Sequence, residues 1–411
     1  MSRLSRRRFL RAAGAGAVAG LAGCSAPTRR NCRPGPGAID TPAQALPTAI
    51  FRQNLDRQGV EAAATVPDAV RVDWRLPGVN TGKHTAAKSS PVPSPTGDVL
   101  VAGDNGEIRS VRPTGSVRWA AETYPSKWGI HGTPVVANGA AYVGAYDGAL
   151  YAFDVETGER LWCANLGDAI GSSPAYHDGT VYVAVEYAAP SGAFFGVDAV
   201  TGETVWESRR PTDQPHSSVA IDRDADRLVV GANDGVLYCY RYPDLEFAWS
   251  FPTGAPIKGP IATYDGAAFF GSWDHIVYRL ALEDGAVDWR FEAGDKVMSG
   301  ASVDPRTGTV YAGSHDTNLY ALDATTGAKR WAFGTGGWLI GCPTVTAEHV
   351  LVGSYDTNVY AVDRERGTET WRVANVGWVT STPLVHDGAI YYAERATPER
   401  AGAAYRLVSG E

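Results

Sequence analysis

Eight tryptophans recur along the chain at nearly constant spacing, and this periodicity constrains the fold more than any other feature. They are Trp74, Trp119, Trp162, Trp206, Trp249, Trp289, Trp331 and Trp371, separated by 45, 43, 44, 43, 40, 42 and 40 residues. A period of about 40–45 residues is typical of β-propellers, in which each repeat forms one four-stranded blade. We therefore expect an all-β fold made of similar sheets.

Each repeat contains short alternating strands separated by tight turns. In one unit the strand Thr309–Gly313 precedes a turn over 314–317, a second strand Asn318–Asp323, a turn over 325–327 and a last strand ending on Trp331. Asp-Gly and Thr-Gly pairs occupy the equivalent turns of other units. Tight hairpins favour these pairs because Gly adopts positive φ without steric cost and Asp tolerates it.

Counting the repeats predicts eight blades. Seven complete units end at Trp119 through Trp371, and the chain from Arg372 onward supplies only three further strands. Residues 70–74 match the last strand of a blade with nothing before it. We expect this strand to pair with residues 403–408 and to close the ring, since closure leaves few sheet edges exposed. A seven-bladed ring is the alternative.

The turn and the strand that follow each second strand carry a family resemblance. The segments at 321–331 (ALDATTGAKRW), 197–206 (VDAVTGETVW) and 153–162 (FDVETGERLW) resemble the tryptophan-docking motif of the pyrroloquinoline-quinone (PQQ) type propeller repeats. The likeness covers residues 70–411. That superfamily includes quinoprotein dehydrogenases and also cofactor-free scaffolds, one of which is the propeller lipoprotein of the outer-membrane β-barrel assembly machinery. The resemblance therefore implies the fold but leaves the activity open.

The eight spaced tryptophans are interpreted as structural docking residues. Each ring is expected to lie between neighbouring blades, to bury on the order of 200 Å² and to have its indole N–H hydrogen-bonded locally. None is assigned as a ligand site.

The N-terminus resembles an export signal. Arg6, Arg7 and Arg8 belong to a twin-arginine motif, and a short apolar stretch leads to Cys24 in a sequence that resembles a lipobox. We expect a signal peptide over 1–23, lipid modification at Cys24 and a location on the outer face of the cytoplasmic membrane. The alternative is a chance cysteine after an ordinary signal peptide. Residues 24–69 lack sustained periodicity and predict a flexible tether, followed by the propeller over 70–411.

Charge and cysteine content exclude some functions. Removing residues 1–23 takes away five arginines, which moves the formal charge from −8 to about −13, so a nucleic-acid partner is not expected. No CxxC or Cys/His spacing suggests a metal site. The remaining cysteines are expected to be free thiols or small apolar fillers, although connectivity cannot be derived from sequence; they are Cys32, Cys163, Cys239 and Cys342.

The candidate binding residues are expected at the mouth of the central channel, where the ligand sites of propellers usually lie. The family resemblance implies that the segment leading into each blade forms its innermost strand. Lys296, Trp338 and Trp378 occupy equivalent places in these segments, with Trp128 near that place. The full candidate set is Lys88, Lys127, Trp128, His131, His216, Lys258, Lys296, Trp338 and Trp378. Cationic and aromatic groups on an acidic protein could hold an anionic or planar ligand or an extended peptide. The alternative is a water-filled channel without a ligand.

Three functions remain compatible with these features. The favoured one is a non-enzymatic, membrane-anchored binding or scaffold propeller whose partner is another protein or peptide at the membrane surface. The second is a quinoprotein alcohol or sugar dehydrogenase, which would require PQQ and Ca²⁺. Against it, the chain lacks an adjacent Cys-Cys pair, long insertions, a matching Glu/Asn/Asp set and a c-type haem motif. The third is a hydrolase or lyase, for which no catalytic residues can be assigned. No cofactor is assigned.

Overall fold

The computed structural model describes residues 32, 39, 44–81 and 89–410. Residues 32–411 form one compact unit, and every statement below concerns its described part. The expectations for Arg6, Arg7, Arg8, Cys24 and Lys88 lie outside the described residues. Within the described residues, no helix is long and apolar enough to cross a membrane.

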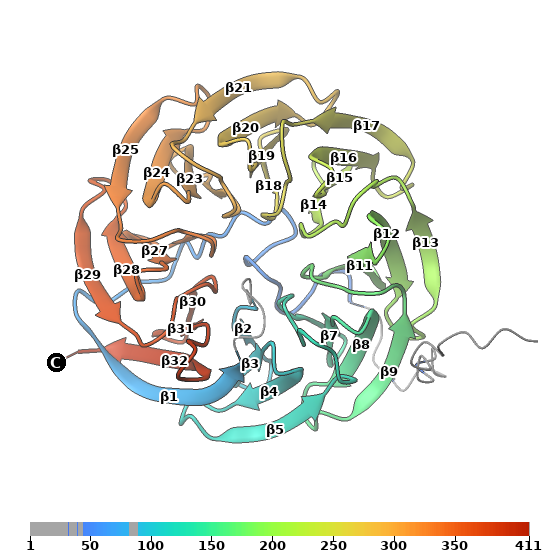
Figure 1. Cartoon of the computed structure of the whole chain (residues 1–411), viewed down its shortest axis with the longest axis horizontal. Helices are drawn as coiled ribbons and strands as arrows, with labels where there is room; N and C mark the ends of the chain where they lie inside the picture. Colours follow the sequence, from blue (N-terminus) through green and yellow to red (C-terminus); the bar gives the residue numbers. More distant parts are fainter. Residues whose placement is uncertain (1–31, 33–38, 40–43, 82–88, 411) are drawn as a thin grey trace, which may run out of the picture. The chain divides into compact units, whose positions relative to one another are not determined.

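Eight four-stranded antiparallel sheets are arranged in a ring (Figure 1), which confirms the eight-bladed propeller. The first two sheets are β2 (Val92–Pro93), β3 (Val99–Ala102), β4 (Glu107–Val111), β5 (Val117–Glu122), and β6 (Val135–Ala137), β7 (Ala140–Gly144), β8 (Ala149–Asp154), β9 (Arg160–Asn165). The next two are β10 (Ala175–His177), β11 (Thr180–Tyr187), β12 (Ser191–Asp198), β13 (Thr204–Ser208), and β14 (Ala220–Asp222), β15 (Arg227–Gly231), β16 (Val236–Arg241), β17 (Phe247–Pro252).

The remaining sheets continue in chain order until the last one, which takes a strand from the other end of the chain. The fifth and sixth are β18 (Ala262–Tyr264), β19 (Ala267–Gly271), β20 (Ile276–Ala281), β21 (Val287–Glu292), and β22 (Ser302–Asp304), β23 (Thr309–Gly313), β24 (Asn318–Asp323), β25 (Lys329–Gly334). The last two are β26 (Thr344–Val345), β27 (His349–Gly353), β28 (Asn358–Asp363), β29 (Glu369–Ala374), and β30 (Leu384–His386), β31 (Ala389–Ala393), β32 (Gly402–Ser409), β1 (Val70–Asn80).

The ring closes by pairing its first strand with its last. β1 runs antiparallel to β32, from Val70 opposite Ser409 to Asn80 opposite Gly402. The two strands lie side by side at the rim, where blue meets red in Figure 1. The predicted closure is confirmed, and the pairing is longer than the two short segments named from sequence.

The side chains of each strand match how deeply that strand is buried in its blade. Middle strands such as β7 and β31 are buried along their whole length, whereas outer strands such as β29 alternate between buried and exposed residues. In the second, fourth, fifth, sixth and seventh blades, the hairpin between the second and third strands is fixed by an Asp that accepts hydrogen bonds from a backbone N–H and from a Tyr four residues later. In one blade, Asp316 Oδ1 accepts from the N–H of Asn318 at 2.9 Å and Oδ2 accepts from Tyr320 Oη at 2.6 Å.

The spaced tryptophans connect each blade to the next. Trp162 Nε1 donates to the carbonyl of Ala199 at 3.0 Å, and its ring packs on Gly202 of the next blade. Trp74, Trp119, Trp249, Trp289, Trp331 and Trp371 donate in the same way to carbonyls 33 to 304 residues away. The ring of Trp206 packs edge-on against Tyr240, with 5.1 Å between centroids. The indole hydrogen bonds therefore join different blades rather than staying local as expected.

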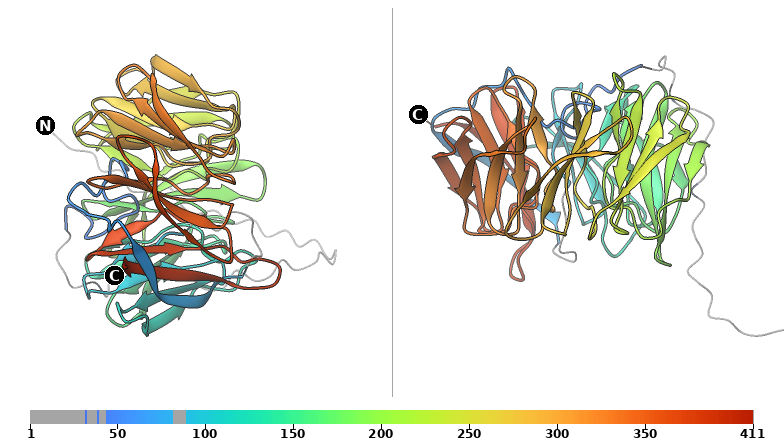
Figure 2. Two further views of the ribbon diagram at one scale, coloured as in Figure 1. Left: turned by 90° about the vertical axis from the view of Figure 1, so that its left-hand side faces the viewer. Right: turned by 90° about the horizontal axis from the view of Figure 1, so that it is seen from above.

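Residues 44–66, which we call the plug, correct the expectation of a flexible tether for this part of the chain. In Figure 1 they cross the middle of the ring, and in the view from above in Figure 2 they follow one face of it. Their backbone pairs with the innermost strands of five blades: Ala49 with Val136, Leu55 with Ile221, Asp56 with Thr263, Gln58 with Val303 and Gly59 with Val345. The plug is therefore folded against the propeller rather than extended into solvent.

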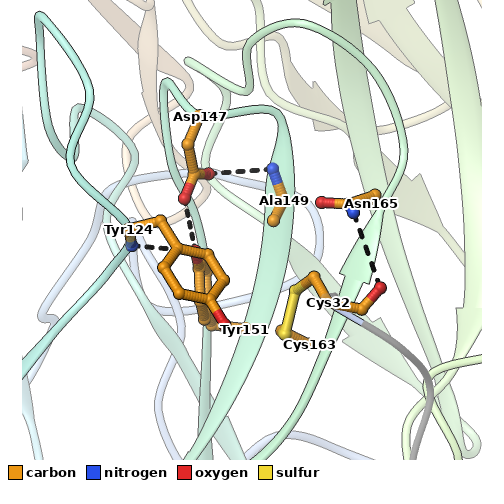
Figure 3. The surroundings of a disulfide bond; sticks show 7 residues. All are labelled: Cys32, Tyr124, Asp147, Ala149, Tyr151, Cys163 and Asn165. Atoms are coloured by element: carbon orange, nitrogen blue, oxygen red, sulfur yellow. Dashed lines mark hydrogen bonds between the residues drawn. A yellow bond between two sulfur atoms is a disulfide. The ribbon is translucent and has the colours of Figure 1, made fainter. Parts of the chain in front are cut away.

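A disulfide joins Cys32 to Cys163 of β9, which corrects the expectation that these cysteines are free. Figure 3 shows the bond beside Asn165, whose Nδ2 donates to the Cys32 carbonyl at 3.5 Å. Cys239 and Cys342 are free and buried. The disulfide fixes the chain ahead of the plug to the second blade.

Candidate functional site

A cavity of about 890 Å³ opens at the mouth of the channel. It lies over the fourth to eighth blades, on the side where the chain enters their innermost strands. Its charged and aromatic lining comprises His216, Lys258, Trp273, Asp295, Lys296, His315, Trp338, Tyr355, Trp378 and Arg395. The volume is in the range that holds a small organic ligand or a few residues of a peptide.

Two lysines share one aromatic face in this cavity. The Nζ atoms of Lys258 and Lys296 lie 4.4 and 4.6 Å from the ring centroid of Trp273. Burial lowers the pKa of Lys258, the nearby Lys296 lowers it further, and the carboxylates of Glu186 and Asp213 oppose the change. The indole stabilises two ammonium groups that would otherwise repel each other, so positive charge is concentrated at one point of the wall.

A row of stacked rings forms the adjacent wall. His315 lies parallel to Trp338 at 4.8 Å between centroids, Trp338 lies 5.6 Å from Tyr355, and Tyr355 stacks on Trp378 at 5.2 Å. Arg395 ends the row, with its guanidinium carbon 5.0 Å above Trp378 and Nη1 donating to Tyr355 Oη at 3.2 Å. Trp338 is 48% exposed, so an aromatic surface remains open to a ligand.

The cavity adjoins a smaller void at its inner end. Met298 and Ile340 line its lower end together with His216 and Lys258. The same four residues also line a small void of about 30 Å³ whose opposite side is Phe51 of the plug. Phe51 of the plug thus borders the void below the cavity, and we call the cavity at the channel mouth the cup.

The cavity does not fit a calcium ion. Ca²⁺ takes six to eight oxygen ligands, usually including several carboxylates. Among the described lining residues Asp295 supplies the one carboxylate, against three cationic side chains. Nor does any group of three or more His, Cys, Asp or Glu side chains in the described part of the chain have the geometry to hold a metal ion.

The structure brings five of the nine predicted mouth residues into this cavity: His216, Lys258, Lys296, Trp338 and Trp378. Their segments are loops that precede the innermost strands, which corrects the expectation that they form those strands. Lys127 lies over Trp128, 5.0 Å from its ring centroid, outside the cavity lining. His131 is buried against Tyr146 and lines the small void instead.

Five of the ten charged and aromatic lining residues were missed from sequence, and one of them, Asp295, directly precedes Lys296. Trp273, His315 and Tyr355 each stand just before the Asp of the hairpin between second and third strands, as in Ser272-Trp273-Asp274. Aligning the repeats on that Asp would have shown an aromatic or imidazole ring at the same place in three successive blades. Arg395 lies between β31 and β32 of the last blade, where the repeat pattern is broken and gives no signal.

The comparisons with known proteins cover almost the whole propeller. A family model described as outer membrane protein assembly factor BamB matches residues 63–208, 195–334 and 320–407. The 1-butanol dehydrogenase (cytochrome c) of Thauera butanivorans is 29% identical over 136 residues, which are 30% of this chain and 19% of that protein. The BamB of Yersinia pestis is 24% identical over 259 residues, which are 55% of this chain and 61% of that protein. The chain thus spans less than two thirds of these curated relatives.

Solved structures of both kinds share the fold. A quinohemoprotein alcohol dehydrogenase of Pseudomonas putida HK5 superposes with a TM-score of 0.74 and 13% identity, covering 91% of this chain and 81% of that one. The BamB of Moraxella catarrhalis superposes with a TM-score of 0.63 and 16% identity, covering 82% and 99%. At these identities the likeness establishes the fold alone.

Proposed function

Because the chain belongs to the BamB-type family of PQQ-like propeller repeats, we propose that it is a non-enzymatic scaffold of the cell envelope. Its binding surface is the cup at the channel mouth. The observation that carries this proposal is the cup itself: three cationic side chains held over aromatic faces, with a single carboxylate among the described lining residues. Relatives named as outer-membrane assembly factors support a protein partner.

The chemistry of the cup favours an anionic group attached to a flat apolar one. Lys258, Lys296 and Arg395 would attract a carboxylate or another anion, while Trp338 and Trp378 would stack on an aromatic side chain. Such a cup on a protein with a formal charge of −8 would attract the ligand locally, whereas the rest of the surface repels it. We therefore propose an extended, acidic and aromatic segment of another protein as the partner, with an anionic planar ligand as the small-molecule equivalent.

A fluorescence titration with 1-anilinonaphthalene-8-sulfonate tests the cup directly, because the probe is both anionic and aromatic. Replacing Lys258 and Lys296 together by Glu should weaken the binding of the probe. We expect a loss of at least about tenfold for each charge-assisted contact that is removed. The control reverses Lys329 and Arg366, two exposed cations near the turns at the opposite ends of the strands. Equal affinities of the two double variants would reject the cup as the binding surface.

A second function, PQQ- and Ca²⁺-dependent alcohol or sugar oxidation, is favoured by the fold likeness to an alcohol dehydrogenase. The described cup residues do not fit the calcium ion, and for this reason we place this function second. The test is to incubate the purified apoprotein with PQQ and Ca²⁺ and to record the quinone spectrum and dye-linked oxidation of alcohols and glucose. Turnover would replace the scaffold function.

We further propose that the protein is exported and anchored. Arg6, Arg7 and Arg8 would direct twin-arginine export, signal cleavage would follow residue 23, and Cys24 would carry the lipid. An envelope location agrees with the relatives named for outer-membrane assembly. The finer expectation, the outer face of the cytoplasmic membrane, belongs to this proposal and is tested by fractionation of the membranes.

A further inference from the structure

The cations of the cup form two groups that belong to different blades. Lys258 and Lys296 share the face of Trp273 and stand in the segments before and after the fifth blade. Arg395, in the eighth blade, lies over Trp378. All of these side chains line the same cavity. A ligand in the cup therefore meets positive charge at two separate places rather than at one.

Each group has an excess of positive charge. The two lysines stand beside one lining carboxylate, Asp295, whose Oδ1 accepts a hydrogen bond from the Lys296 N–H at 2.7 Å. Next to Arg395 in the chain, the buried carboxylate of Glu394 is already engaged. Its Oε1 lies 3.1 Å from Arg75 Nη2, and its Oε2 accepts two backbone N–H groups at 3.0 and 2.7 Å. One ligand carboxylate at each place would therefore complement the cup.

A continuous row of rings connects the two cationic groups. Its members are His315, Trp338, Tyr355 and Trp378. At one end the His315 N–H donates to the Lys296 carbonyl at 2.9 Å, and at the other end stands Arg395. Contacts of 4.8, 5.6, 5.2 and 5.0 Å in series place Arg395 at most about 20 Å from His315. The direct distance is shorter, since the sixth to eighth blades follow a curve around the mouth (Figure 1).

An extended peptide matches this layout at one spacing. Its residues advance about 3.3 Å each and alternate between two faces, so residues i, i+2 and i+4 point the same way and the outer two are about 13 Å apart. Acidic side chains at i and i+4 extend this reach at both ends, and a ring at i+2 lies over the exposed Trp338 within the row. A spacing of i+2 spans only about 7 Å, and i+3 or i+5 turns one carboxylate to the opposite face.

We propose that the cup selects an extended segment with the pattern acidic–x–aromatic–x–acidic. One carboxylate binds Lys258 and Lys296, the aromatic ring lies on Trp338, and the other carboxylate binds Arg395. This inference rests on the proposed function, because it takes an acidic and aromatic segment as the partner, and it adds the spacing that makes such a segment specific. A single carboxylate, or two at an odd spacing, would not meet both cationic groups at once.

Fluorescence anisotropy with two labelled heptapeptides of identical composition tests the spacing. The first peptide has Glu at its second and sixth positions, Trp at its fourth and Ser elsewhere; in the second peptide the last Glu moves to the fifth position. Both carry the fluorophore on the amino group and an amidated C-terminus, so that the ends add no charge. We expect the first peptide to bind about tenfold more tightly, because it makes one more charge-assisted hydrogen bond.

Variants of the last blade test which cation reads the second carboxylate. Arg395→Gln should remove the difference in affinity between the two peptides, whereas Arg400→Gln should preserve it. Arg400 is the matched control because it lies exposed in the same loop before β32 and outside the cup lining. A difference that persists in Arg395→Gln would overturn the assignment of Arg395.

The peptide comparison uses the unaltered protein, so it is decisive even if Arg395→Gln fails to fold. Equal affinities of the two peptides would overturn the spacing and leave the acidic partner of the proposed function in place. No binding of either peptide would overturn the proposed partner as well as the spacing.

Discussion

Asp56 should make the attachment of the plug depend on pH. Burial raises its pKa to about 6, the carboxylates of Asp222 and Asp224 raise it further, and the Thr263 hydroxyl and Arg223 oppose the rise. At about 1.36 kcal/mol per pKa unit, the change from 3.8 to about 6 corresponds to about 3 kcal/mol. Because the side chain is partly exposed, solvent screening reduces this cost to about 1–2 kcal/mol.

The sign of the pH dependence of plug attachment follows from proton binding to Asp56. Below about pH 3 the carboxyl is protonated in both the attached and the detached plug, so ionisation costs nothing. As the pH rises from about 4 to 6, the detached form ionises first and the attached form loses stability. Above about pH 6 the full cost applies. Asp56→Asn removes the charge and keeps an oxygen that can accept from Thr263 Oγ1, which lies 3.3 Å from Asp56 Oδ1.

Hydrogen exchange at the amide of Thr263 measures this attachment, since that N–H donates to the Asp56 carbonyl at 2.8 Å. We expect Asp56→Asn to raise its protection factor about 5- to 30-fold at pH 7.5 relative to the unaltered protein, and to leave it nearly unchanged at about pH 3. Glu399→Gln, in the exposed loop before β32, controls for the change in net charge. The same ratio of protection factors between Asp56→Asn and the unaltered protein at both pH values would refute the reasoning.

Three other predictions concern the blades and the anchor. Trp162→Ala should lower the free energy of unfolding by about 3–5 kcal/mol in urea denaturation, and a loss below about 1 kcal/mol would exclude a docking role. Gly327→Ala should cost more than Gly308→Ala by calorimetry, because both have positive φ but only the first Cβ would meet a ring, 2.7 Å from Trp289 Cδ2; equal costs would argue against this contact. Cys24→Ser should move the protein from the membrane to the soluble fraction, and continued membrane retention would exclude the lipid anchor.

The blades could be predicted from sequence because their signal repeats. Each unit places a tryptophan, a Gly-containing turn and two alternating strands at the same offsets, so errors at single residues average out over eight copies. Even the closure of the ring followed from a single strand at the start of the repeats and a blade of only three strands at their end. The physical reason is that an incomplete blade leaves a sheet edge unpaired.

The plug could not be predicted because its interactions leave no periodic trace. Residues 44–66 attach mainly through backbone groups that pair with the innermost strands, and any sequence can supply those groups. The buried Arg52 and Arg57 of the plug carried no signal either, since isolated arginines usually lie at the surface. The disulfide was missed because the partners Cys32 and Cys163 are 131 residues apart.

About half of the charged and aromatic cup residues could be predicted, because they stand in repeated segments of the sequence. Lys296, Trp338 and Trp378 stand at matching offsets in the segments that lead into successive blades, and Lys258 stands nearby in the equivalent segment of the preceding blade. The second half of the wall comes from the hairpins between second and third strands, such as the one that contains Tyr355. Two loops of one blade meet only after the blade has folded, so their proximity is a property of the sheet.

Site-specific photocrosslinking tests the central claim, that the cup is where this protein meets its partner. A photoreactive amino acid would replace Trp338 in the cup or, as a control, Val205, which is 60% exposed on the outer strand β13. We predict a discrete protein adduct in native membranes from position 338, lost on Lys258→Glu/Lys296→Glu, and none from position 205. Adducts of equal yield from both positions, or a yield at 338 that ignores the charge reversal, would contradict the account.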